Sequence, residues 1–348
     1  LDSSYSMAHM WLGLVLDATQ GPKAAFEEYR AAHRSDPLHP VINGNLARAL
    51  AQMGRYDDAR SYLQRSEQAN PDSSTLRMHL SWLDSYYGRH DESVRWALSA
   101  TENSDKAADK MRMLLAISFA TMGDIDRATS FLAEGNPETI SKQDFDVRAI
   151  VLFAGGEYSR LLNLAKARIA HHSEQDADYA GLSELAWSGV AQIAQGDHAA
   201  AASDLSDFLV NAKPKHLEAP RHITILGLLA YSYDQVGDPQ RRDEFIARSL
   251  EVYERERVRG WASPAFHAAI AGTYALQGDR EAAVDELATA ARQGWRDHYW
   301  MQVDPRFTAL RGDPDYEASV SVMRDDLDAM LERASEIVDA QLTAKNQR

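Results

Sequence analysis

The sequence contains no cysteine and no long uncharged stretch, and each absence excludes a class of protein. Without cysteine there is no disulfide framework, no thiolate nucleophile and no Cys-ligated zinc. The longest uncharged apolar stretch, 223–231, is far shorter than the ~20 residues that a membrane-spanning helix needs. An N-terminal secretion segment and an Asn-x-Ser/Thr acceptor are also missing. We therefore expect a soluble, cytoplasmic protein with no membrane partner.

Basic side chains are outnumbered, with 37 Lys and Arg against 52 Asp and Glu, which gives a formal net charge of −15. Direct binding of nucleic acid needs clustered basic residues that displace counterions from phosphates, so we do not expect it.

Catalytic signatures are missing too. The sequence has no Gly-x-Gly-x-x-Gly, no Gly-x4-Gly-Lys-Ser/Thr, no His-Glu-x-x-His and no Gly-x-Ser-x-Gly. We therefore expect no enzymatic activity and no cofactor.

Internal repetition is the strongest signal that is present. Length alone suggests two domains, but a segment that recurs at a nearly constant spacing indicates stacked repeats instead. The segment Gly-Arg-Tyr-Asp-Asp-Ala at 54–59 returns in similar form along the chain. Eight units are predicted, with turn glycines at Gly21, Gly54, Gly88, Gly123, Gly156, Gly196, Gly237 and Gly278, and with spacings from Gly54 onward of 34, 35, 33, 40, 41 and 41 residues.

Each unit has the pattern of two helices joined at its glycine. In the second unit, Leu46, Leu50 and Met53 are spaced to form one buried stripe on a first helix. Glycine permits the left-handed conformation that ends a helix, and an acidic residue just after it favours the start of the next helix. The small residue Ala59, five positions after Gly54, fits a close helix crossing. The units thus predict an all-α array of helical pairs.

These residues resemble the tetratricopeptide repeat. The second unit matches its pattern with Leu46, Ala47, Gly54, Tyr56, Ala59, Leu63 and Pro71. The resemblance covers roughly residues 6–291, although the later units are longer and carry Arg242 at the small-residue position. It implies a right-handed superhelical solenoid of about eight helix-turn-helix repeats with a C-terminal capping helix.

Both ends of the chain depart from the repeat. Residues 292–348 are predicted to form a cap with a long acidic helix, because the last repeat of a solenoid must cover its apolar face. The order Gly294-Trp295, Asp304-Pro305 and 310–316 resembles the C-terminal ends of repeat regions in bacterial signalling proteins, including winged-helix regulators, nucleotide cyclases and Ser/Thr kinases. That resemblance implies an effector domain before Leu1. Residues 1–5 are predicted to be the remnant of an upstream helix or linker, and the missing initiator Met indicates a piece of a longer protein or the product of tag removal.

A ligand-binding groove is implied by the resemblance, because the first helix of each repeat lines the concave face in this family. Aromatic side chains and Arg supply much of the affinity of protein interfaces, so they are the candidates of interest. The alternative is that the aromatic residues only pack between repeats. Counting from the turn glycines, the predicted groove residues are Asn45, Arg48, Gln52, Trp82, Tyr86, Met113, Ile117, Phe153, Trp187 and Tyr231.

Two further kinds of site are considered and not expected. Neighbouring histidines on a helix point about 100° apart, so the best metal candidates are assigned to solvated loops and no metal site is predicted. Those candidates are His171, His172, Asp176 and Asp178 in one loop, with His216 and His222 flanking another at 211–221, while the acidic run 325–328 is assigned to a solvated helix face. Some repeats of this family grip a chaperone C-terminus with Lys, Asn and Arg, and here only Asn45 fits among the aligned Met10, Leu14, Asn45, Thr75 and His79.

The sequence therefore predicts a non-catalytic interaction or sensory module of a bacterial signalling or regulatory protein. Its partner would be a peptide segment or a protein held in the concave groove. Three alternatives stay open, which are a regulatory domain that binds a small-molecule effector, a scaffold that senses nothing and, with least support, a helical enzyme.

Overall fold

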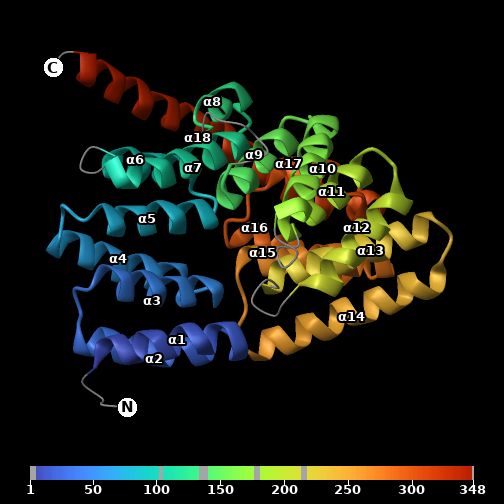
Figure 1. Ribbon diagram of the computed structural model, residues 1–348, viewed down its shortest axis with the longest axis horizontal. Coiled ribbons are helices and arrows are strands. Elements are labelled where there is room, and N and C mark those ends of the chain that lie inside the picture. Colours follow the sequence, from blue (N-terminus) through green and yellow to red (C-terminus); the bar gives the residue numbers. More distant parts are fainter. Residues whose placement is uncertain (1–4, 102–104, 133–139, 176–180, 213–217, 347–348) are drawn as a thin grey trace.

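The computed structural model describes residues 5–101, 105–132, 140–175, 181–212 and 218–346. Within these ranges every regular element is a helix, and the predicted all-α array of eight helical pairs is confirmed (Figure 1). Repeats 1 to 8 are α1 (Ser6–Gln20) with α2 (Pro22–Ser35), α3 (Pro40–Gln52) with α4 (Tyr56–Ala69), α5 (Ser74–Tyr86) with α6 (His90–Thr101), α7 (Asp105–Thr121) with α8 (Ile125–Ser130), α9 (Lys142–Ala154) with α10 (Tyr158–Gln175), α11 (Leu182–Ala194) with α12 (His198–Asn211), α13 (Ala219–Gln235) with α14 (Pro239–Val258), and α15 (Pro264–Gln277) with α16 (Arg280–Arg292). The chain continues through α17 (His298–Val303), the 3₁₀ helix η2 (Pro305–Leu310) and α18 (Pro314–Asn346).

The turn inside each repeat follows from its glycine. All eight predicted turn glycines have positive φ, between 65° and 91°, a region that glycine enters without steric cost. In four repeats the aspartate after the glycine caps the second helix, because its carboxylate accepts a hydrogen bond from a backbone N–H three residues on. These caps are Asp124, Asp197, Asp238 and Asp279.

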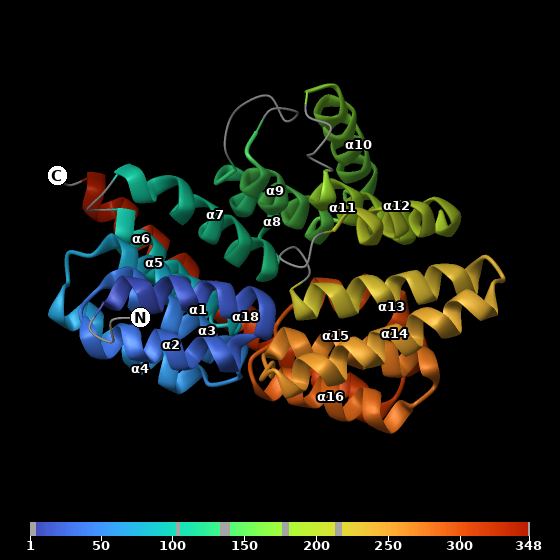
Figure 2. The ribbon, with the colours of Figure 1, turned by 60° about the horizontal axis from the view of Figure 1, so that its bottom comes forward.

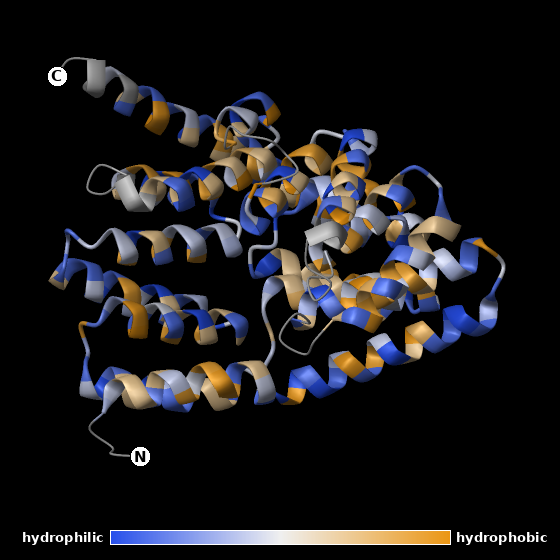
Figure 3. Cartoon of the chain, viewed as in Figure 1, coloured by the Kyte–Doolittle hydropathy of each residue, from blue (hydrophilic) through white to orange (hydrophobic). Residues whose placement is uncertain are grey.

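Packing within a repeat uses the small residues that the sequence places at helix crossings. Ala59 and Leu63 are fully buried, and a Cβ on Gly189 would come within 2.5 Å of the Leu205 Cγ. Along α14, hydrophobic residues alternate with hydrophilic ones (Figure 3), as an amphipathic helix over a core requires.

The array curls back on itself, so that its C-terminal half contacts its first three repeats (Figures 1 and 2). The backbone N–H of Lys23 donates to the Arg259 carbonyl at 3.2 Å, and the N–H of Ala262 donates to the Gln52 carbonyl at 2.9 Å. The hydroxyl of Tyr86 also donates to the Ser263 Oγ at 2.9 Å. These contacts lie at the start of α2 and at the ends of α3 and α5, and they close the solenoid.

The cap reaches further than the predicted cover over the last repeat. α18 packs on α16 and then continues along α6 of repeat 3 (Figure 1). There the Arg333 Nε lies 2.6 Å from an Asp91 carboxylate oxygen, and the Arg127 guanidinium donates to the Ser335 Oγ at 3.1 Å. The cap therefore connects repeat 8 to repeats 3 and 4.

Two loop predictions are corrected in part, where the structure describes them. His171 lies within α10, which runs to Gln175, while Asp176 and Asp178 lie outside the described residues. Pro220 and Arg221 belong to the first turn of α13, where the missing N–H of proline costs no helical hydrogen bond, and His222 follows them on that helix. His216 lies outside the described residues. Among the described residues, no helix has the length and apolar character needed to cross a bilayer.

Candidate binding groove

An open cavity of about 420 Å³ lies on the concave face of repeats 2 to 5, and we call it the inner groove. It is formed by α3, α5, α7 and α9, the first helices of four consecutive repeats. The lining residues occupy the same positions in each repeat. They lie thirteen, ten, nine or six residues before the turn glycine of their repeat. The lining residues are Gly44, Asn45, Arg48, Met78, His79, Trp82, Lys110, Met113, Leu114, Ile117, Gln143, Asp146 and Val147.

The floor of the inner groove is apolar and half-exposed. Met78, Met113 and Ile117 remain partly accessible on neighbouring helices, while Trp82 stacks on Tyr86 with ring centroids 5.2 Å apart. Met side chains adapt their shape to different partners, and aromatic rings supply large contact areas. This floor can therefore bury apolar side chains of a ligand.

Polar side chains stand on the walls of the inner groove. The Arg48 guanidinium pairs with the Asp17 carboxylate at 2.5 Å, and Ser183 donates a hydrogen bond to Asp146. His79 lies directly over α3, where a Cβ on Gly44 would come within 2.1 Å of its ring. Burial, helped by the nearby charges of Lys110 and Arg48, lowers the pKa of His79 to about 4, so the ring is neutral at pH 7.

Five of the ten predicted residues meet in the inner groove, namely Asn45, Arg48, Trp82, Met113 and Ile117. Met78, Lys110, Gln143 and Asp146 also line it and were missed. Their distance in sequence from the turn glycine would have identified them, if the same positions had been taken in every repeat without giving preference to aromatic residues.

The other five predicted residues lie elsewhere. Gln52 lines a separate cleft, and Tyr86 is engaged with Ser263. Phe153 is buried, 3% exposed, with the Trp187 ring 5.9 Å away and the Trp300 ring 5.0 Å away. Tyr231 packs against His198 with ring centroids 5.4 Å apart. Phe153 and Tyr231 therefore pack against other aromatic side chains, which is the alternative considered for the predicted groove residues.

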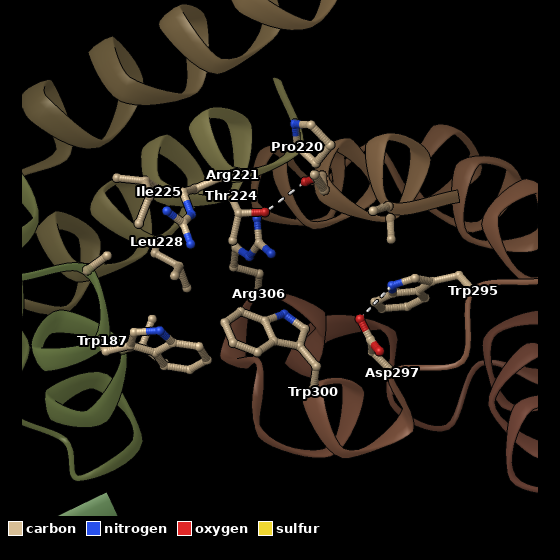
Figure 4. A pocket seen from close by; sticks show the side chains of 15 residues that line it. Trp187, Pro220, Arg221, Thr224, Ile225, Leu228, Trp295, Asp297, Trp300 and Arg306 are labelled. Atoms are coloured by element: carbon tan, nitrogen blue, oxygen red, sulfur yellow. Dashed lines mark hydrogen bonds between the residues drawn. The ribbon is translucent and has the colours of Figure 1, made fainter. Parts of the chain in front are cut away.

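Repeats 6 to 8 have a concave face as well, but the cap segment lies on it, and we call this the capped face (Figure 4). Trp187 from α11, Thr224 and Leu228 from α13, and Trp300 and Arg306 from the cap surround a remaining cavity of about 230 Å³. The buried Arg306 guanidinium pairs with the Asp304 carboxylate at 2.6 Å and donates to the Ala269 carbonyl at 3.3 Å. The cap segment thus covers the part of the concave face that corresponds to the inner groove in repeats 2 to 5.

One carboxyl on the capped face is electrostatically unusual. Asp297 accepts a hydrogen bond from the Trp295 indole N–H at 3.1 Å (Figure 4). Burial raises the pKa of Asp297 to about 6, although that hydrogen bond acts in the opposite direction.

Within the described part of the chain, no group of three or more His, Asp and Glu side chains is arranged to hold a metal ion. The acidic stretch Asp325, Asp326 and Asp328 lies on α18, where Asp326 pairs with Arg296 at 2.6 Å.

Comparison with known proteins agrees with this architecture. The family model described as "Tetratricopeptide repeat" matches residues 21–83, from the first turn glycine into α5. The chain has the fold of an all-α solenoid of tetratricopeptide-like repeats. This fold indicates a protein–protein interaction module.

Solved structures also match the chain at low sequence identity. A Rap protein complexed with competence and sporulation factor is 12% identical, with 95% of this chain and 99% of that chain covered and a TM-score of 0.54. A tetratricopeptide repeat protein from Parabacteroides merdae is 12% identical, with 87% and 98% covered and a TM-score of 0.31. No curated protein sequence matches the chain.

Proposed function

We propose that this tetratricopeptide-repeat chain is the interaction module of a bacterial signalling or regulatory protein, and that it holds a polypeptide segment of a partner in the inner groove. The observation that carries the proposal is the open, apolar floor formed by Met78, Trp82, Met113 and Ile117. The sequence-based resemblance to bacterial regulators supports the signalling context, and a cytoplasmic location stays a prediction.

A polypeptide suits the groove because of its shape. The inner groove crosses four first helices and is open along its length, whereas sites for small molecules enclose most of the ligand surface. Asn45 and Gln143 place side-chain amides at the walls, where they can pair with peptide groups of an extended segment. The Rap protein of similar fold, 99% of which is covered, forms a complex with competence and sporulation factor, and this supports a binding role for the fold.

The proposal is tested with peptides selected from a random phage-displayed library on the purified chain. Met78→Ala combined with Met113→Ala should weaken the selected peptides by more than about tenfold, since two apolar contacts are lost. The matched control is Val210→Ala, because Val210 is 82% exposed on α12, a second helix. Circular dichroism should show the same helical content in all three chains.

Two results would contradict the proposal. Equal affinity of the double variant and the control would move the binding site away from the inner groove. Native mass spectrometry that finds a retained small molecule, displaced by neither peptide nor variant, would favour the effector-binding alternative.

A further inference from the structure

The inner groove does not end at repeat 2, because Arg48 also lines a second and more polar cavity. This polar cleft, of about 630 Å³, lies between α1 and α3 on one side and α13 and α14 on the other. It exists because the array closes on itself, and α13 therefore faces the first two repeats. The groove and the cleft form one continuous surface that meets at Arg48.

Charges along this surface are mostly neutralised by the chain itself. Arg48 pairs with Asp17 at 2.5 Å, and Glu256 accepts from Arg255 at 2.8 Å and from Arg259 at 3.0 Å. Burial lowers the pKa of His222 in the cleft to about 4, so this ring is uncharged at pH 7. Such groups need no counter-charge from a ligand.

Two lining charges differ from the others. Lys110 on α7 and Glu218 at the start of α13 are exposed and have no ion-pair partner among the residues that the structure describes. The Asp146 carboxylate also has no ion pair there, but it is half-buried and accepts a hydrogen bond from Ser183. Their order follows from the helices that carry them. In the inner groove, His79 on α5 lies between Lys110 on α7 and Arg48 on α3, and Arg48 lines the polar cleft together with Glu218. A cation and an anion therefore stand at opposite ends of one row, with the apolar floor of the groove next to the cation.

Resting on the proposed function, we propose that the partner segment is bipolar, with an acidic residue opposite Lys110, a basic residue opposite Glu218 and apolar residues between them. Opposite charges at the rim of an interface mainly set orientation and association rate. From Lys110 on α7 to Arg48 on α3 there are two steps between packed helices of about 8–10 Å each, which corresponds to roughly five or six residues of extended chain. Glu218 lies beyond Arg48, across the polar cleft, so the two charged residues of the segment are at least that far apart. The segment therefore binds in one direction only.

The inference is tested by charge reversal with the same selected peptides as probes. Lys110→Glu and Glu218→Lys should each weaken them about five- to tenfold, because one attraction becomes a repulsion at an exposed site. Lys166→Glu on α10 and Glu244→Lys on α14 are matched controls, since both residues are exposed on second helices away from the groove. The double reversal should select new peptides in which the acidic and basic residues have exchanged places.

The outcomes separate this inference from the proposed function. Peptides that lose affinity with Met78→Ala and Met113→Ala but are insensitive to both reversals would overturn the bipolar segment and leave the groove intact. Peptides that are insensitive to all four substitutions would overturn both. Exchange of the two charges in the newly selected peptides would establish the orientation.

Discussion

The two halves of the concave face carry different residues at equivalent positions, and the difference decides which half is open. Ten residues before the turn glycine, repeats 3 and 4 carry Met78 and Met113, whereas repeats 7 and 8 carry Gly227 and Ala268. A Cβ on Gly227 would lie 2.7 Å from an Arg306 guanidinium nitrogen, so the small residue is what admits the cap.

The lesson is that one repeated scaffold can serve two purposes. Small residues on the inner face of repeats 6 to 8 let the chain place its own Trp300 and Arg306 there. Large apolar residues on the inner face of repeats 3 and 4 stay partly exposed, which is unfavourable unless a partner covers them. The capped face is thus part of the core, whereas the inner groove stays open, as the proposed function requires.

The largest expected effect comes from breaking the capped face at its buried ion pair. Arg306→Ala leaves the Asp304 carboxylate buried without its counter-charge, so we expect a loss of about 3–5 kcal/mol in the free energy of unfolding. Urea unfolding followed by tryptophan fluorescence measures it. Arg324→Ala, at an exposed pair with Asp325, is the control and should cost less than about 1 kcal/mol. Similar losses in the two variants would mean that the cap is not part of the core.

The closure that places the cap can be tested at the turn glycines. Gly88 and Gly123 both have positive φ, but a Cβ on Gly88 would lie 2.0 Å from the Gly294 carbonyl oxygen, and one on Gly123 meets nothing within 4 Å. Alanine at either site should cost about 1 kcal/mol for the backbone conformation, and at Gly88 about 1–3 kcal/mol more for the clash. Thermal unfolding of the two variants measures the difference. Equal midpoints would show that the closing contact is not formed in solution.

Asp297 should make the capped face sensitive to pH. Its pKa is raised to about 6 in the folded chain, so the folded state resists ionisation and loses stability as the pH rises from about 4 to 6. Relative to Asp297→Asn, the natural chain should lose about 2 kcal/mol across that interval. Subtracting the two pH profiles removes the opposite effect of His79 and His222, whose pKa values are lowered to about 4 and which destabilise the fold on acidification. Parallel profiles would show that Asp297 titrates normally.

The smallest expected effect on stability is on the open half. Met113→Ala should change the free energy of unfolding by less than about 1 kcal/mol, since the side chain is already partly exposed. Phe153→Ala, under the cap, should cost about 3–5 kcal/mol because it leaves a cavity. Denaturant titration of both variants makes the comparison. A Met113 variant as unstable as the Phe153 variant would place the groove floor in the core.

Local regularities of the fold were predictable from the sequence, because they depend on short-range chemistry. The turn glycines, the aspartate caps such as Asp279 and the small residue Ala59 each act within one repeat. The residues on the inner face follow from their distance in sequence to the turn glycine. This is why Trp82 and Met113 were predicted to line the same groove.

Long-range closure could not be read from the repeats. The hydrogen bond from Tyr86 to Ser263 joins residues 177 positions apart, and no local pattern specifies it. The same holds for Trp300, which approaches Phe153 across the concave face and turns a predicted groove residue into a packed one. The position of a residue relative to its turn glycine shows that it lies on the inner face. It does not show which part of that face is covered by the cap.

The most direct test of this account is photo-crosslinking of a selected peptide that carries a photoreactive residue, with the attachment sites located by mass spectrometry. We expect attachment to α5 and α7, which form the floor of the inner groove. Attachment to α11 and α13 would contradict the account, because it would show that a ligand displaces the cap from the capped face.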